Sequence, residues 1–471
     1  MPFKDMPDFL RRVEKGIPMS GNTGGKQIDM LHGPMAGRIF LFAMPIAATS
    51  ILQQLFNAAD VAVVGQFAGS SALAAVGSNS PVISFFVNII VGLAVGATAV
   101  ASRLVGLQRK EEMQQLVQTV VLFALLAGFA VLAVGEGVAS PLLQLLGTPE
   151  NVLSEAVLYL RIYLLGMPVI VVYNFLAAIL RSVGDSRRPL YVLVASGVVN
   201  VGLNLLLVIV FHMGVAGVAI ATVVSNLIST GILWVILMRE DEMIRLEPKK
   251  LRIHRKQLLN ILKIGAPASL QSSFFTISNL CMQAGINSLG SAVVAGTAVA
   301  QNYMNISFFI VQAYDQAAVA FTGQNYGAGQ YDRCRRVLGI SLLESILTTG
   351  VWITAVLLLR YPAISLFTSD AQVIPHTLTY LFVCLLPHSL VCVYETLGSY
   401  MRALEHSLLP AMMTVVGSVI FRILWLNTVF VYWPDYGVLM SVYPISWIVT
   451  ILLMVLAYLS VRKKIFPAKS A

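Results

Sequence analysis

One carboxylate lies in the middle of a long apolar stretch of the chain. Asp60 stands within FNAADVAVVGQFAG, residues 56–69, and the apolar stretch opens at Ile39. A charged side chain near the centre of a bilayer costs at least about 2.5–3.5 kcal/mol and usually faces a cavity or a partner. Because an amide would hold helices together at a lower cost, we interpret Asp60 as a functional group that binds a cation.

Side chains with amide and hydroxyl oxygens recur at helical spacing in the same half of the chain. Gln53, Asn57 and Asp60 follow one another at i, i+4 and i+7, which places them on one helical face. Ser196 and two later asparagines repeat this arrangement. The predicted cation-coupling site contains one carboxylate, four amides and one hydroxyl: Asp60, Asn57, Asn174, Asn200, Asn204 and Thr222.

The oxygen ligands of this site suit Na⁺, whereas a carboxylate alone suits H⁺, so both coupling ions stay open. A Na⁺ ion would be held by four of the side chains: Asp60, Asn200, Asn204 and Thr222. The alternative role for the amides and the hydroxyl is structural, because interhelical hydrogen bonds contribute about 0.6 kcal/mol each. For Asn200, Asn204 or Thr222 taken alone, we prefer the structural role.

The second half of the chain carries acids and aromatic rings. Glu395 and Asp315 stand in apolar segments, with aromatic residues close to Asp315 in the sequence. Such a combination binds organic cations through charge and cation–π attraction, although aromatic residues at helical spacing also pack helix cores. The predicted substrate cavity comprises Glu395, Asn279, Gln283, Asn305, Gln312 and Asp315. Arg422 either contacts a substrate phosphate or pairs with one of the two acids, and we prefer the pairing.

The elements that position these residues are membrane helices. Of 471 residues, 57% are hydrophobic and 11% are charged, whereas soluble domains carry about 25% charged residues. About 20 apolar residues span a bilayer as a helix. The sequence predicts an all-α polytopic membrane protein with twelve spans, centred near residues 50, 88, 125, 168, 199, 226, 275, 306, 348, 388, 420 and 449.

The net charge of +9 is distributed as expected for a membrane protein. The loops GQFAGSS, FHMG and NSLGS, expected outside, have no basic residue, whereas the opposite segments are rich in Lys and Arg. This bias predicts that both termini are cytoplasmic. We expect the basic residues to contact anionic membrane lipid and not nucleic acid.

The two halves of the chain repeat each other at a nearly fixed offset. Pro45 matches Pro267 and Arg181 matches Arg402, and the two offsets differ by a single position. Six spans per half is an even number, so the repeat is parallel, with a pseudo-two-fold axis along the membrane normal and a pathway between the lobes. The predicted parts are an N-terminal cytoplasmic tail (1–33), an N-lobe (34–238), a cytoplasmic linker (239–259), a C-lobe (260–462) and a C-terminal tail (463–471).

Other chemistries find little support in the sequence. The four cysteines lack CxxC spacing, which predicts neither a metal site nor a disulfide framework. No combination of Ser, His and Asp at catalytic spacing is present, and we expect neither an enzyme nor a bound cofactor.

Five segments together resemble the multidrug and toxic compound extrusion (MATE) transporters. They are P-x11-N-x2-D-x4-G from Pro45 to Gly65, ALAAVG at 72–77, LRSVGDSRRP at 180–189, FTGQNYGAG at 321–329 and YPISW at 443–447. The resemblance covers residues 34–462 and is greatest to the bacterial drug exporters. It implies two six-helix lobes that open alternately, and export of cationic amphipathic compounds in exchange for H⁺ or Na⁺.

The resemblance also assigns residues. It implies that Asp60 is the coupling acid and that Glu395 matches an acid of the tenth helix, whereas Asn204 stands where many relatives have aspartate. We expect a monomer in the plasma membrane of a bacterium. The alternative is a lipid-linked oligosaccharide flippase of the same superfamily, which would need a basic central cavity.

Overall fold

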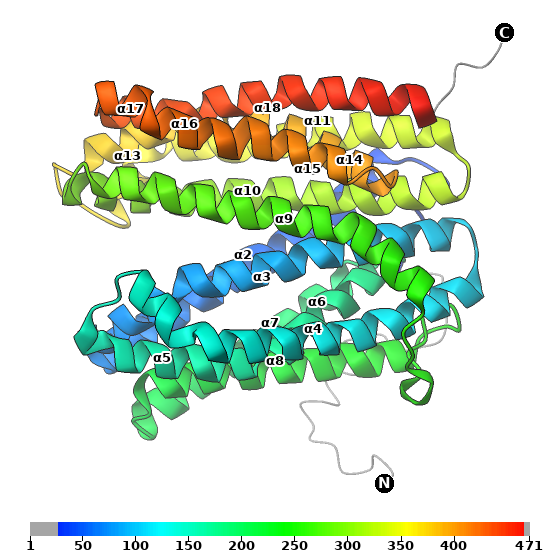
Figure 1. The fold of residues 1–471 in the computed structure, drawn as a ribbon, viewed down its shortest axis with the longest axis horizontal. Helices are drawn as coiled ribbons and strands as arrows, with labels where there is room; N and C mark the ends of the chain where they lie inside the picture. Colours follow the sequence, from blue (N-terminus) through cyan, green and yellow to red (C-terminus); the bar gives the residue numbers. More distant parts are fainter. Residues whose placement is uncertain (1–26, 466–471) are drawn as a thin grey trace.

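The structure, a computed structural model, describes residues 27–465, and within this range it is built of helices and loops without β-strands. Figure 1 shows two groups of helices, one above the other, which we call the N-lobe (α2–α8) and the C-lobe (α9–α18). The helices of the N-lobe are α2 (Ala36–Phe67), α3 (Gly69–Gly106), α4 (Lys110–Leu145), α5 (Glu150–Leu165), α6 (Met167–Ser182), α7 (Arg187–Leu205), the π-helical η2 (Leu206–Val210) and α8 (Gly214–Met238).

The C-lobe follows a linker that holds one short helical turn, η3 (Pro248–Lys250). Its spans are more often interrupted than those of the N-lobe, and two of them contain π-helical turns. The elements are α9 (Arg255–Asn287), α10 (Ser291–Gly327), α11 (Tyr331–Leu358), α12 (Arg360–Ser365), α13 (Ile374–Tyr380), η4 (Leu381–Leu385), η5 (Leu386–His388), α14 (Ser389–Ala403), α15 (Leu408–Thr414), η6 (Val415–Ile420), α16 (Phe421–Asn427), α17 (Val429–Tyr432) and α18 (Tyr436–Ile465).

The predicted span centres all fall inside these helices, and the all-helical two-lobe fold is confirmed. In residues 27–465, nine helices are long and apolar enough to cross a membrane, and the bent pair α5 and α6 makes a tenth. The remaining two long helices, α9 and α10, have 33 and 37 residues but fall short in hydropathy. Both contain several of the amides predicted to line the substrate cavity, and this explains their lower hydropathy.

The fourth span is broken because of its local sequence. α5 and α6 meet at an angle of 46°. Pro168 stands in the first turn of α6, where a missing N–H breaks no helical hydrogen bond. Gly166 lies at the break, and a Cβ there would come within 2.8 Å of Val223 on α8. The bend therefore depends on a glycine that lets α8 approach closely.

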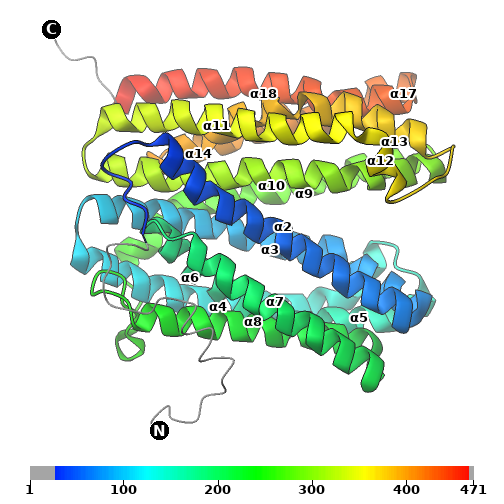
Figure 2. The ribbon, with the colours of Figure 1, turned by 180° about the vertical axis from the view of Figure 1, so that it is seen from behind.

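The lobes meet at one end of the molecule, which we call the linker end because residues 239–254 lie there. Glycines allow the contact: a Cβ on Gly96 would lie 2.5 Å from the carbonyl oxygen of Ile261, and a Cβ on Gly106 2.0 Å from that of Gln324. Close backbone approach through small residues is typical of membrane helices. Toward the opposite, far end the two lobes draw apart, as Figures 1 and 2 show.

Helix α2 contacts both lobes. Its first half packs against α10, with Phe42 and Phe321 edge to face at 5.7 Å, and its second half packs against α7 and α8 of the N-lobe. Figure 2 shows α2 running obliquely between the two groups of helices. A change at the end of α2 that holds Asp60 can therefore act on the contact between the lobes.

Residues 27–35, which we call the N-terminal strap, join the lobes at the linker end. The backbone N–H of Ile28 donates to Gly184 of the N-lobe at 3.1 Å. On the other side, the amide of Asn325 donates to the Met30 carbonyl at 3.0 Å, and Arg333 donates to the same carbonyl at 3.3 Å. The strap thus bridges α6 and the α10–α11 corner.

The predicted lobe boundaries stay predictions. The tails were expected at 1–33 and 463–471; residues 1–26 and 466–471 of them lie outside the described residues. The linker is docked to the N-lobe, since the N–H of His254 donates to Thr119 of α4 at 3.0 Å.

Candidate functional site

Asp60 is buried in the N-lobe within a small polar cage. Its exposed fraction is 6%. One carboxylate oxygen accepts a hydrogen bond from the Asn204 amide, and the other accepts one from the Thr222 hydroxyl at 3.3 Å. The Asn204 amide also lies 3.3 Å from Oδ1 of Asn200. Helices α2, α7 and α8 thus bring together four of the six residues predicted for cation coupling.

A glycine allows α2 and α7 to approach each other at this site. A Cβ on Gly197 would lie 2.0 Å from the ring of Phe56, which is one turn before Asp60. No larger residue fits between the helices without displacing that ring. The contact fixes the distance between α2 and α7 at the height of the cage.

The cage provides one net charge and several oxygens. In the described part of the chain Asp60 forms no ion pair, so its charge is balanced only by an amide and a hydroxyl. Burial without a counter-ion disfavours the charged form of a carboxylate. Oδ1 of Asn204 is buried without a hydrogen-bond partner, and it adds an unused acceptor to those of Asp60 and Asn200. These oxygen atoms could bind a Na⁺ ion, or the carboxylate of Asp60 could bind a proton.

The other two predicted cation-site residues lie outside the cage. Asn57 is exposed. Asn174 donates its amide to the Ile170 carbonyl of its own helix at 2.9 Å. The spacing in the sequence placed Asn57 and Asp60 on the same face of α2. It could not show that α7 and α8 cover Asp60 and leave Asn57 exposed.

Two tyrosines beside the cage were missed from the sequence. Tyr159 and Tyr163 of α5 interact electrostatically with Asp60, and their rings stack with centroids 6.3 Å apart. Their i, i+4 spacing is a signal for a shared helical face. That spacing alone does not tell which helix the face contacts.

The C-lobe holds a denser set of charges. Asp315 of α10, Glu395 of α14 and Arg402 lie close enough for their charges to influence one another, although no ion pair joins Arg402 to either acid in residues 27–465. Arg402 is 7% exposed and donates to Gln271 of α9 at 3.0 Å. Oδ1 of Asp315 is buried without a partner. The structure therefore brings the two predicted acids together with an arginine that the sequence had not linked to them.

The amides predicted for the substrate cavity are dispersed. Asn279 and Asn305 are exposed, and Gln312 is partly buried. Gln283 donates to Asn287 on the same helix at 2.8 Å. No hydrogen bond between residues 27 and 465 joins these four side chains to either acid.

The preferred pairing of Arg422 with Glu395 or Asp315 is wrong. Its guanidinium carbon lies 4.5 Å from the ring centroid of Tyr443 and 5.0 Å from that of Phe275. Arg402, one helical span earlier, is the arginine beside the acids. The sequence could not distinguish the two, because both stand in apolar segments of the same half.

Comparisons with known proteins place the chain in a family. The MatE family model matches residues 45–206 and 267–426, more than half of the chain, and the two matches begin at Pro45 and Pro267. The chain belongs to the MatE family. The repeat recognised from these two prolines is thus a repeat of one family unit.

Relatives of this MatE protein cover most of its length. It is 25% identical to a probable multidrug resistance protein, YoeA of Bacillus subtilis, over 80% of this chain and 82% of that protein. It is 27% identical to an FAD transporter of Shewanella oneidensis, over 78% and 81% of the two chains. A solved structure of a multidrug resistance MATE family transporter in an outward-facing conformation matches with a TM-score of 0.84 at 20% identity, covering 93% and 98%. The chain is a multi-pass membrane transporter of this family.

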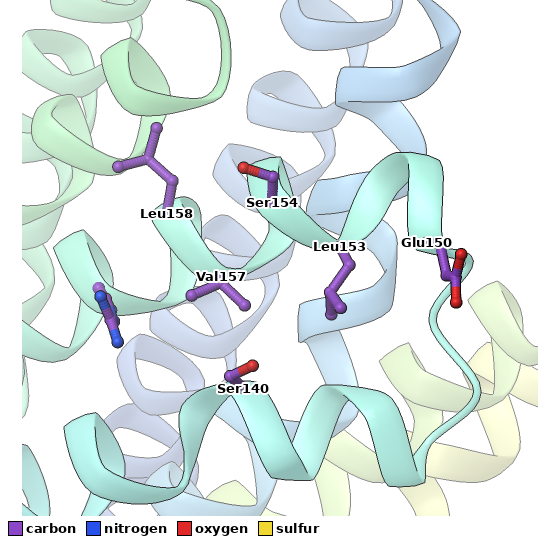
Figure 3. Close-up of a pocket in the computed structure, with 7 residues that line it drawn as sticks. Ser140, Glu150, Leu153, Ser154, Val157 and Leu158 are labelled. Atoms are coloured by element: carbon purple, nitrogen blue, oxygen red, sulfur yellow. The ribbon is translucent and has the colours of Figure 1, made fainter.

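A surface pocket of the MatE protein lies away from the polar residues described above. Figure 3 shows it between α4 and α5, where Ser140 faces Leu153 and Val157 across the two helices. None of the predicted site residues lines it. Within residues 27–465, no group of three or more His, Cys, Asp and Glu residues could hold a metal ion.

Proposed function

We propose that this MatE protein is a secondary antiporter that exports cationic amphipathic compounds in exchange for H⁺ or Na⁺. The observation that carries the proposal is the buried carboxylate of Asp60, which has no cationic partner in the described chain and is held by two donors from α7 and α8. Such a carboxylate gains stability when a proton or a Na⁺ ion neutralises it.

Both donors have a second acceptor within reach. The Thr222 hydroxyl lies 3.0 Å from the Val218 carbonyl, and the Asn204 amide lies 3.3 Å from Oδ1 of Asn200. When a cation neutralises Asp60, the hydrogen bonds to its carboxylate weaken, and each group keeps the bond to its second acceptor. The cage therefore has two arrangements, and the cation favours one of them.

Helix α2 carries the change to the lobe interface. Asp60 lies in its second half, and its first half packs on α10 of the C-lobe. Loss of the bonds to α7 and α8 frees the second half of α2 to move, and Pro45 supplies a weak point within the first half, where α2 packs on α10. Cation binding thus alters the contact on which the closed linker end depends.

The substrate would bind between the lobes, with Asp315 and Glu395 attracting a cationic group. We further propose that the protein lies in the plasma membrane of a bacterium with both termini cytoplasmic, works as a monomer and uses no cofactor. The FAD transporter among its relatives shows that substrates differ between related proteins.

Reconstituted liposomes provide the test. Ethidium transport would be measured under an imposed pH gradient and, separately, under a Na⁺ gradient, for the wild type, Asp60→Asn and Met282→Leu. Met282 occupies the repeat position of Asp60 and is fully buried, so its volume-conserving change is the matched control. We expect one gradient to drive transport in the wild type and the control but not in Asp60→Asn. If the wild type moves no organic cation under either gradient, the proposal fails, and a fluorescent lipid-linked sugar would test the flippase alternative.

A further inference from the structure

Arg422 is a buried charge whose hydrogen bonds are incomplete. It is 1% exposed, and its Nε donates to the Ser446 hydroxyl at 3.2 Å. Its Nη1 is buried without a hydrogen-bond partner, and no acid of the described chain lies within ion-pair distance. A guanidinium stays charged at any physiological pH and offers five N–H donors. An uncompensated charge of this kind is strongly unfavourable unless an anion joins it.

The groups around Arg422 stabilise its charge only in part. Tyr443 and Phe275 place their rings 4.5 Å and 5.0 Å from the guanidinium carbon. Aromatic faces attract a cation, but they provide no acceptor for the N–H groups of Nη1 in the guanidinium plane. That plane matches the fork of a carboxylate or phosphate, which a guanidinium binds with two parallel hydrogen bonds.

In the internal repeat, the position of Arg422 in the C-lobe is equivalent to that of a cage residue in the N-lobe. Pro189 and Pro410 occupy equivalent positions in the two halves, and the π-helical turn η6 follows Pro410. A π-helical turn adds one residue to a helix, so we infer that beyond it the offset between the halves grows by one, which pairs Arg422 with Asn200. Met282 stands at the repeat position of Asp60. The C-lobe thus has a thioether in place of the carboxylate and a guanidinium in place of the amide.

We propose that Arg422 is an anion-recognition residue of the C-lobe, which binds the carboxylate or phosphate of an aromatic amphipathic substrate. The proposal rests on the transport function proposed above and narrows its substrate class: the substrate carries an anionic group for Arg422 besides any cationic group that Asp315 and Glu395 attract. Phe275 is partly exposed on α9, in the half of the helix that follows Pro267. The proposal requires this ring, which lies 5.0 Å from the guanidinium carbon, to move aside when the anionic group of the substrate binds.

A matched pair of dyes tests the proposal. A rhodamine with a free carboxyl group and its methyl ester share the same cationic ring system and differ only in the anionic group. Their binding to purified wild-type protein in phosphatidylcholine nanodiscs would be measured by fluorescence anisotropy. We expect the wild type to bind the acid at least about tenfold more tightly than the ester.

Variants test whether the preference for the acid over the ester depends on the guanidinium of Arg422. Arg422→Gln is expected to remove the preference for the acid while it still binds the ester, and Arg422→Lys to keep part of it, because an ammonium lacks the planar fork. Phe275→Ala, which removes one of the two rings beside the guanidinium, is expected to increase the preference. A repeat of the measurement with phosphatidylglycerol in the nanodiscs identifies the source of the anion. A preference abolished by this anionic lipid overturns the proposal and assigns the site to a lipid headgroup, and a preference that persists supports a soluble substrate.

Three further results would overturn the inference. The wild type could bind the ester as tightly as the acid, which decides the matter even where an Arg422 variant does not fold. A folded Arg422→Gln protein could retain the preference. Binding of neither dye would contradict this inference and the proposed function together, whereas gradient-driven export of the ester without any preference for the acid would contradict this inference alone.

Discussion

The N-lobe and the C-lobe share a helical plan but differ in how they balance buried charge. In the N-lobe, Asp60 has only an amide and a hydroxyl for partners. In the C-lobe, Asp315 and Glu395 lie near Arg402, an arginine of the same lobe. A carboxylate without an internal cation must take its counter-charge from outside. From this comparison we expect the N-lobe to be the half that responds to a free ion.

The largest expected effect follows from moving the acid between the lobes. Asp60→Asn combined with Met282→Asp keeps the number of acids but places the carboxylate in the C-lobe at a fully buried site. We expect coupled transport in liposomes to fall by at least about a hundredfold, because the cage of Asn204 and Thr222 has no counterpart there. Recovery of gradient-driven transport in this double variant would show that the lobes are interchangeable.

The next effect concerns the two arginines related by the repeat. Arg402→Met leaves Gln271 without its donor, which costs about 1–3 kcal/mol, and adds repulsion between Asp315 and Glu395. Arg181→Met, the matched control, removes a guanidinium that donates no hydrogen bond in residues 27–465, and we expect a loss below about 1 kcal/mol. Thermal unfolding of both variants in detergent measures the difference. Equal losses would contradict the distinct charge balance of the lobes.

A smaller effect tests the packing that holds the cage. Gly197→Ala forces the ring of Phe56 away and is expected to lower the free energy of unfolding by about 1–3 kcal/mol, with slower transport. On the same helix, a Cβ on Gly202 would meet no atom within 4 Å. Gly202→Ala is therefore expected to be neutral or slightly stabilising, since alanine favours a helix. If the two variants behave alike, the close approach of α2 and α7 does not limit the site.

The smallest effect is expected at the interface between the lobes. Arg103 of α3 pairs with Glu405 of the C-lobe, and both side chains are about one-third exposed, at 37% and 34%. Exposed ion pairs contribute about 0.2–1 kcal/mol. A double-mutant cycle of Arg103→Ala and Glu405→Ala should give a coupling energy in this range that declines with salt. A coupling well above the range of exposed pairs would mean that this ion pair, rather than glycine packing, holds the linker end closed.

The sequence predicted the fold more fully than the sites. The apolar segments of span length and the repeat of Pro45 and Pro267 predicted the helices. In a bilayer the backbone N–H and C=O groups of such a segment must bond to each other, and a helix satisfies all of them. Local bends depend on single residues such as Gly166 and were not predicted. They arise from contacts with a distant helix, here α8.

The sites were predicted in part for a related reason. Asp60 was identified because a lone acid in an apolar helix is costly wherever it points. Asn57, Asn174 and Asn204 all have an amide side chain. Of these three, Asn204 is the one that contacts Asp60. Which amide reaches the acid depends on the rotation of each helix about its axis. That rotation is set by packing between helices, such as Phe56 against Gly197. The pattern of residues within one helix does not predict such packing.

The N-terminal strap has a consequence for recognising such a contact in other chains. The strap offers its carbonyls at Met30 and Gly33, which every residue type supplies, and its N–H at Ile28, which every residue type except proline supplies. The receiving residues are different. Asn325 and Arg333 must provide side-chain donors, and at Gly184 a Cβ would lie 2.5 Å from the Ile28 carbonyl. A homologue could therefore replace most of the strap and keep the bridge, and its presence would be read from Asn325, Arg333 and Gly184.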